Sequence, residues 1–176
     1  MSKRLTLYVP QIAELWYREK LLSDPDTMSY NKGYNLNSVT YHNDTGCIDF
    51  PENQWQQWYD YFVMNSPQCY YAYIKRIEDG CFIGEVNLHK NNSGEWYDMG
   101  IVLEGQYRGQ DFSVEAMRLL LNEAFGEFSA VAVRNDFEAT REAALKLHLS
   151  VGFEIVNEEN GIILLEITKE KYCGID

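Results

Sequence analysis

The clearest chemical pattern of this 176-residue chain lies in residues 97–125. Apolar residues occupy every second position of its first part, at Met99, Ile101 and Leu103. This alternation predicts a strand, and apolar residues from Phe112 onward predict a long helix after a turn that holds Arg108 and Gly109. The first N–H groups of a helix have no partner within it, so a glycine turn followed by a helix start can bind an anion. We expect the function of the protein here.

The rest of the chain predicts the elements that position this stretch. Strands are expected at 5–9, 69–77, 81–89, 97–104, 130–134, 152–156 and 162–168, and helices at 11–22, 51–64, 112–125 and 138–150. The segment 23–51 is rich in turn signals, and its Tyr30, Tyr34 and Tyr41 suit either a substrate-facing loop or aromatic packing over the core edge. The order of elements predicts one α/β (α+β) domain with a mixed sheet over residues 1–176.

The bulk composition narrows the class of protein. Lys and Arg number 15 against 27 Asp and Glu, a net charge of −12, which argues against nucleic acid and anionic membranes as partners. The same charge is compatible with a cationic amine as substrate. Four widely spaced cysteines and no recognisable signal peptide predict free thiols and a cytoplasmic protein, and the histidines lack zinc spacing, so no metal is expected.

Three landmarks occur in order over residues 84–153. The first is Ile83-Gly84 with Val86 and Leu88, followed by Asp98-Met99-Gly100-Ile101; the second is Tyr107-Arg108-Gly109 leading into Glu115-Ala116; the third is Ala144-Leu145-Lys146-Leu147-His148 followed by Gly152-Phe153. In this order they resemble the GNAT superfamily of acyl-CoA-dependent N-acyltransferases. The most similar branch contains the ribosomal-protein-alanine and spermidine acetyltransferases.

The resemblance implies a GNAT-like fold with acetyl-CoA as acyl donor. Its mixed, mostly antiparallel sheet would have about seven strands, flanked by about four helices and splayed at the middle strands. The pantetheine arm would pair with the backbone of Ile101, Val102 and Leu103, and Asn135 and Arg141 would touch the cofactor as well. The pyrophosphate would bind the N–H groups of Arg108, Gly109, Gln110, Asp111, Phe112, Ser113 and Val114.

The resemblance also implies two catalytic candidates. Asp98 lies where relatives often have a glutamate that takes the proton of the amine; Glu85 is a second candidate carboxylate. His148 stands where many relatives have a tyrosine, and its imidazole could protonate the departing thiolate. For Asp98 the alternative is a polar residue on an edge face, and for His148 a histidine packed against the core.

Asp111 departs from the family pattern, which has glycine at this position. A carboxylate about 5 Å from a pyrophosphate charge would cost about 3 kcal/mol at an effective dielectric constant near 20. Asp111 could also cap the helix and occupy the N–H groups that a phosphate needs, although aspartate tolerates a positive φ better than most residues. The residue either turns to solvent or marks a weakened cofactor site.

The sequence therefore predicts an N-acetyltransferase that acts on a primary amine, either a small cationic amine or a protein N-terminus. The amine would attack acetyl-CoA directly in a ternary complex, and a homodimer would be typical of the family. Two rivals are a non-catalytic binding protein with a cofactor loop weakened by Asp111, and a structural interaction module.

Overall fold

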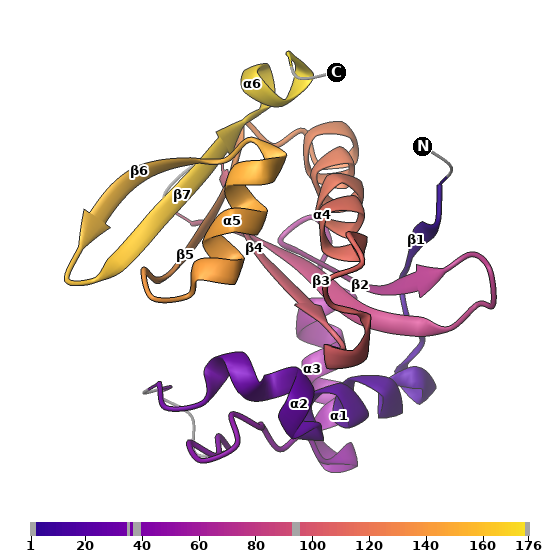
Figure 1. Ribbon diagram of the computed structural model, residues 1–176. Coiled ribbons are helices and arrows are strands. Elements are labelled where there is room, and N and C mark those ends of the chain that lie inside the picture. The colour runs from indigo at the N-terminus through magenta and orange to yellow at the C-terminus, as the bar shows by residue number, and fades with distance from the viewer. Residues whose placement is uncertain (1–2, 35, 37–39, 93–95, 175–176) are drawn as a thin grey trace.

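We describe the protein from a computed structural model, which covers residues 3–34, 36, 40–92 and 96–174 (Figure 1). Its strands are β1 (Leu5–Tyr8), β2 (Cys69–Arg76), β3 (Phe82–Lys90), β4 (Trp96–Leu103), β5 (Ala132–Glu138), β6 (Glu154–Glu159) and β7 (Ile162–Thr168). Its helices are α1 (Trp16–Ser23), α2 (Pro25–Met28), α3 (Trp55–Phe62), α4 (Phe112–Asn122), α5 (Glu142–Val151) and α6 (Lys169–Cys173). A π-helical turn, Glu123–Glu127, continues α4.

The seven strands form one open sheet in the order β1-β2-β3-β4-β5-β7-β6. Only β4 and β5 are parallel, so the predicted mixed and mostly antiparallel sheet is confirmed. The pairing of β4 with β5 ends at Asp98 and Arg134, although both strands continue beyond these residues. On its other side β4 stays paired with β3 as far as Leu103. The sheet therefore splays between its two middle strands.

Helices cover both faces of the sheet (Figure 1). On one face α4 and α5 pack over the largest cluster of buried apolar side chains, which includes Met117, Leu120 and Phe153. On the other face α1 and α3 pack over two smaller clusters that are rich in tyrosine and tryptophan. Because side chains alternate along a strand, alternate residues of β2, β3 and β4 point to the α1–α3 face.

Several predicted boundaries were wrong. β5 extends to Glu138 because residues 132–138 pair with β7, and α5 begins only at Glu142. The turn between β6 and β7 is the two residues Asn160 and Gly161, both with positive φ, as tight hairpins favour. The described residues contain six helices rather than about four, because the segment 23–51 includes the short α2 and the chain after β7 forms α6.

The cysteines and the helices bear on two further predictions. Each of the four cysteines is free, with Cys47 and Cys69 buried and Cys81 and Cys173 exposed, as expected. No helix among the described residues is long and apolar enough to cross a membrane.

Candidate active site

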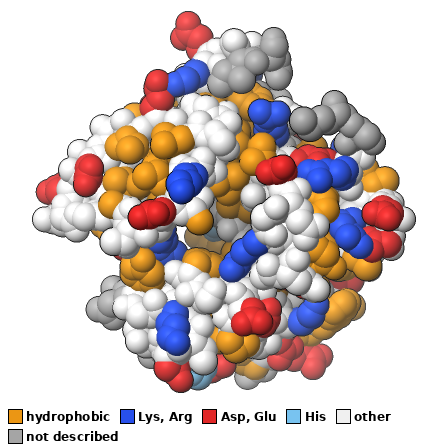
Figure 2. Space-filling view, in the orientation of Figure 1, with side chains coloured by type: hydrophobic (Ala, Val, Ile, Leu, Met, Phe, Trp, Pro, Cys, Tyr) orange, Lys and Arg blue, Asp and Glu red, His pale blue; other side chains and the backbone are white. Residues whose placement is uncertain are grey.

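A cavity of about 930 Å³ lies where β4 and β5 separate. Its walls come from the segment 29–34, from β3 and β4, from the loop before α4, and from β5 and α5. Figure 2 shows a hollow at the middle of this face, with Lys and Arg side chains near it. The cavity thus reaches the unpaired half of β4 and the start of α4, which are the two features that the sequence singled out.

The loop before α4 holds two residues with left-handed backbone. Gly109 has a φ of 73° and Asp111 a φ of 61°. The exposed Asp111 is the N-cap of α4, yet its side chain makes no capping hydrogen bond. The first N–H groups of α4 are therefore not capped by this carboxylate. Two unfavourable effects of Asp111 on anion binding were expected. Its carboxylate does not occupy these N–H groups, but its negative charge would still repel a bound anion.

Arg108 lines the cavity, and its guanidinium is held by the backbone of α2. Nη1 donates to the carbonyl of Asp26 at 3.3 Å, and Nη2 donates to the carbonyl of Thr27. Carbonyl groups fix the side chain without neutralising its charge. Arg108 therefore joins the loop before α4 to the α1–α2 corner and keeps a positive charge at the cavity wall.

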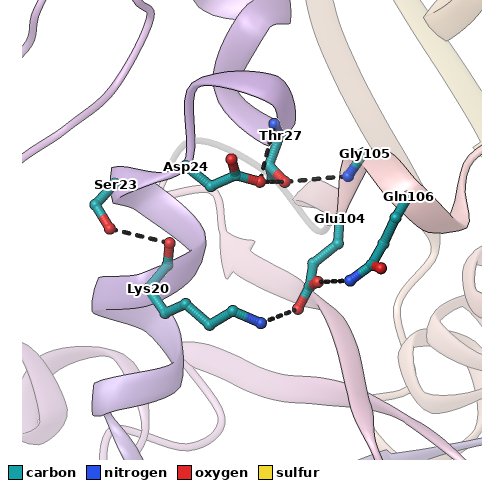
Figure 3. Close-up of polar contacts among 7 residues, drawn as sticks. All are labelled: Lys20, Ser23, Asp24, Thr27, Glu104, Gly105 and Gln106. Carbon is teal, nitrogen blue, oxygen red and sulfur yellow. Dashed lines mark hydrogen bonds and ion pairs between the residues drawn. The ribbon is translucent and has the colours of Figure 1, made fainter.

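A second connection between the same segments appears in Figure 3. Asp24 caps α2 by accepting from the backbone N–H of Thr27 at 3.2 Å and from its hydroxyl. The Thr27 oxygen in turn accepts from the N–H of Gly105 at 3.0 Å. At the end of β4, buried Glu104 accepts from Lys20 at 3.1 Å and from Gln106 at 2.8 Å. These contacts fix where the loop begins.

The segment 29–34 lies against the β5–α5 connection. The Tyr34 hydroxyl is hydrogen-bonded with Thr140 Oγ1 at 3.0 Å, and the Arg141 guanidinium lies 4.3 Å from the centre of the Tyr34 ring. Arg141 also pairs with Glu138 at 2.6 Å. Tyr30 and Tyr34 line the cavity, whereas the Tyr41 hydroxyl lies 2.8 Å from the carbonyl of Tyr34 and supports the segment from behind.

His148 is buried beside the cavity and both of its ring nitrogens are engaged. Nδ1 lies 2.8 Å from the carbonyl of Ala144, which can only accept, so Nδ1 carries the proton. Nε2 then accepts from the Asn135 side-chain amide at 3.0 Å. Burial lowers the pKa of His148 and favours the neutral ring. In this state His148 orients Asn135 and presents no proton to the cavity.

Asp98 does not belong to the cavity wall. Three residues on neighbouring strands lie side by side: Cys69 on β2 pairs with His89 on β3, and His89 pairs with Asp98 on β4. Asn91 donates to Asp98 at 3.4 Å, and the Cys69 sulfur lies 3.7 Å from His89 Nδ1. Asp98 is two residues from Gly100, which does line the cavity, a distance of about 7 Å along a strand.

Glu85, the second candidate carboxylate, is buried in an ion pair with Arg18 on the α1–α3 face. The Tyr71 hydroxyl donates to the other carboxylate oxygen. The Arg18 guanidinium lies 4.4 Å from the ring centre of Trp58 and 5.2 Å from that of Phe50. Burial lowers the pKa of Arg18, but the charge of Glu85 and the contacts with Glu85 and Tyr71 together raise the pKa overall. Glu85 is thus fully engaged within the protein.

The structure brings most predicted cofactor residues to one cavity. Its lining includes Ile101, Val102, Leu103, Arg108, Gly109, Ser113, Asn135, Arg141 and His148. It does not include Asp98, Gln110, Asp111, Phe112 or Val114. Phe112 is instead buried in the core, and Gln110 bonds to the carbonyl of Gln106 at 3.1 Å. Among the described residues, no group of three or more His, Cys, Asp or Glu is placed to hold a metal ion.

Sequence reasoning missed Lys32 and Asn87. Lys32 follows the short helical turn after α2 and lines the cavity. Asn87 pairs with Gly100 on β4, where a Cβ would lie only 2.6 Å from Asn87 Nδ2. The Asn87 amide therefore covers the glycine, and a side chain at residue 100 would displace it. A polar residue flanked by Val86 and Leu88 was the available signal for Asn87; Lys32 had none.

Comparison with known proteins agrees with this geometry. The family model of the acetyltransferase (GNAT) domain matches residues 4–154. The chain therefore belongs to the GNAT acetyltransferase family. No curated protein matches the sequence.

Solved structures with the same fold cover nearly the whole chain. A spermidine N-acetyltransferase from Vibrio cholerae, in complex with CoA and spermine, has a TM-score of 0.75 at 15% identity and covers 98% of this chain and 99% of its own. A GNAT-family acetyltransferase from Bacillus anthracis has a TM-score of 0.72 at 14% identity, with 97% and 98% covered. Apo FdhC, a nucleotide-linked sugar GNAT, has a TM-score of 0.75 at 17% identity, with 98% and 90% covered. These similarities establish the fold.

Proposed function

We propose that the protein transfers an acetyl group from acetyl-CoA to a primary amine, within a single domain and by direct attack in a ternary complex. The observation that carries this proposal is the cavity at the β4–β5 splay, which joins unpaired strand backbone to the uncapped start of α4. The acceptor is a small amine or a protein N-terminus. The homodimer and the cytoplasmic location expected from the sequence stay predictions.

The residues present fit this donor. The backbone of Ile101, Val102 and Leu103 faces the splay without a partner on β5, as an extended amide-bearing arm requires. The N–H groups at the start of α4 and the charge of Arg108 suit a pyrophosphate. When bound, acetyl-CoA supplies an acetyl thioester.

The reaction forms a bond from the amine nitrogen to the acetyl carbonyl carbon and breaks the thioester C–S bond. One amine proton must leave and the thiolate must gain one. We propose Asp98 as the base, acting through water because it lies outside the cavity lining, about 7 Å along β4 from Gly100. His148 makes two buried hydrogen bonds, to Ala144 and Asn135. They favour a role for His148 in orienting Asn135, rather than the role of general acid expected from the sequence.

Asp111 favours a second candidate, a binding protein on the same fold with a weakened cofactor loop. Its left-handed backbone is one that glycine would adopt more easily, and its carboxylate adds a negative charge where an anion would bind. Cofactor affinity separates the two candidates.

The test is calorimetric titration of acetyl-CoA into the wild-type protein, Asp111→Asn and Asp111→Gly. Asparagine tolerates the same backbone and removes only the charge. We expect wild-type binding that tightens in both variants, by about 4-fold if water fully screens the charge at about 5 Å. Thiol release is then measured with a panel of amines. Binding by the variants alone would favour the second candidate, and binding by no form would refute the acetyltransferase proposal.

A further inference from the structure

Charged side chains are unevenly distributed around the cavity. Lys32, Arg108 and Arg141 line it together with two carboxylates, Asp136 and Glu142. Both carboxylates belong to the β5–α5 wall. Residues 29–34 with Asn87 form another part of the wall, which contributes a lysine and no carboxylate among the described residues. The local charge here is therefore opposite to the net charge of −12 for the chain.

Two of the three cations keep their charge uncompensated. Arg141 pairs with Glu138 at 2.6 Å. Lys32 and Arg108 form no ion pair with any described residue, and Arg108 is held only by backbone carbonyls. Lys32 thus lines the wall made by residues 29–34 with an ammonium group that has no ion-pair partner among the described residues.

Glu85 is a buried carboxylate outside the cavity lining, and it already has a cationic partner. Glu85 lies on the α1–α3 face of the sheet, one row from Asn87 and Gly100, and pairs with Arg18. The aromatic rings around it, Trp58, Phe50 and Tyr71, are typical partners of an organic cation, and the Arg18 guanidinium lies among them at 4.4–5.5 Å from the ring centres. The protein's own arginine therefore occupies this cluster and leaves Glu85 without a free charge for a cation of the acceptor.

Tyr30 also lines this wall and lies near positively charged arginines. Burial, followed by the charge of Glu85, raises the pKa of Tyr30 to about 12, whereas Arg141, Arg18 and Arg108 each act to lower it. The Tyr30 hydroxyl thus stays protonated between the cavity and the Arg18–Glu85 pair. It gives this wall a neutral hydrogen-bonding group instead of a negative one.

We propose that the acceptor is a small amine that also carries an acidic group, a carboxylate or a phosphate, and that Lys32 pairs with this group. The proposal rests on the acetyl transfer proposed above and replaces the cationic acceptor suggested by the net charge. The acidic group binds the ammonium of Lys32. Asn87 and Gly100 form the end of the cavity where the amine meets the thioester. Polyamines are poor acceptors, because their further cations meet the ammonium of Lys32 and find Glu85 paired with Arg18.

The test compares matched acceptors with the wild type, Lys32→Glu and Lys32→Gln. The pairs are glycine with glycinamide and phosphoethanolamine with ethanolamine, so a carboxylate and a phosphate are tested separately; 1,4-diaminobutane represents the polyamines. Thiol release gives kcat/KM, and calorimetry gives binding of acetyl-CoA and of each acceptor in the presence of CoA. Lys146→Glu, exposed on α5 outside the cavity lining, controls for the change in net charge.

Lys32→Glu should lower kcat/KM for an acidic acceptor by at least about tenfold, since a hydrogen bond to a charged group is lost. The neutral partner of each pair and the affinity for acetyl-CoA should change less than about twofold, and Lys146→Glu should behave as the wild type. Equal effects on both members of each pair, or a wild-type preference for the diamine, would overturn the proposal. Lys32-dependent binding of an acidic amine without thiol release would support the Lys32 site and refute acetyl transfer. Binding of no amine would refute the Lys32 site directly.

Discussion

The buried pair of Arg18 and Glu85 allows a quantitative prediction. The two side chains are only 16% and 4% exposed, and each charge has the other as its ion-pair partner. Glu85→Gln keeps the shape of the side chain and can still accept from Tyr71, but it leaves the guanidinium of Arg18 buried without a negative partner. Removing one member of a buried pair costs about 3–5 kcal/mol, and we expect the lower end because the Trp58 contact remains.

The assay is urea unfolding followed by far-ultraviolet circular dichroism, with thermal unfolding beside it. A loss of about 3 kcal/mol corresponds to a drop in Tm of about 6–12 °C for a chain of this length. Arg18→Met should cost a similar amount, since it leaves the Glu85 carboxylate unpaired. The double variant Arg18→Met/Glu85→Gln should be less destabilised than the sum of the two single variants, because neither charge is then left alone.

A surface pair provides the matched control. Glu154 and Lys171 form an ion pair at 67% and 35% exposure, so Glu154→Gln should cost less than about 1 kcal/mol. The reasoning is refuted if Glu85→Gln costs no more than this control, or if the two single substitutions add without coupling. Either result would mean that Arg18 and Glu85 are not a buried pair, and the argument against polyamine acceptors would lose its basis.

Two further predictions concern the α2 connection and the buried histidine. Thr27→Val should lower stability by about 1–3 kcal/mol and weaken acetyl-CoA binding, because the N–H of Gly105 loses the fully buried Thr27 hydroxyl as its partner. Thr27→Ser keeps the hydroxyl and should retain both properties. An unchanged acetyl-CoA affinity and Tm in the valine variant would contradict the role of this hydrogen bond. Burial lowers the folded-state pKa of His148 below its ordinary value of 6.5, so the unfolded chain binds the extra proton first as pH falls. Stability is then complete above about pH 6.5 and declines below it, and in urea titrations from pH 7.5 to 5 this decline should be shallower in His148→Gln; parallel curves would exclude the contribution of His148.

Elements whose signals are local could be predicted from the amino-acid sequence. The alternation at Met99, Ile101 and Leu103 and the apolar run after Phe112 predicted β4 and α4, since periodicity is set by each element's own backbone geometry. Gly109 lies in the predicted turn and has left-handed backbone, and aspartate's tolerance of positive φ allowed for the same backbone at Asp111. The order of such local signals resembled the family, and that resemblance implied the splayed sheet.

Only the tertiary structure decided which of these residues meet. β5 is longer than predicted because its second half pairs with β7, a partner that the segment does not encode locally. His148 is neutral because it is buried between Ala144 and Asn135. Burial of a charge and the identity of its partner depend on distance in space.

The clearest example is the buried pair of Arg18 and Glu85. Arg18 and Glu85 are 67 residues apart in the chain, and no spacing rule links them, yet the packing of α1 on the sheet makes them an ion pair. The fold also brings Lys32 to the cavity and leaves Asp98 outside its lining. Composition gave the chain a strongly negative net charge, but the fold placed uncompensated positive charge at this site, because local electrostatics follow from which side chains the fold brings together.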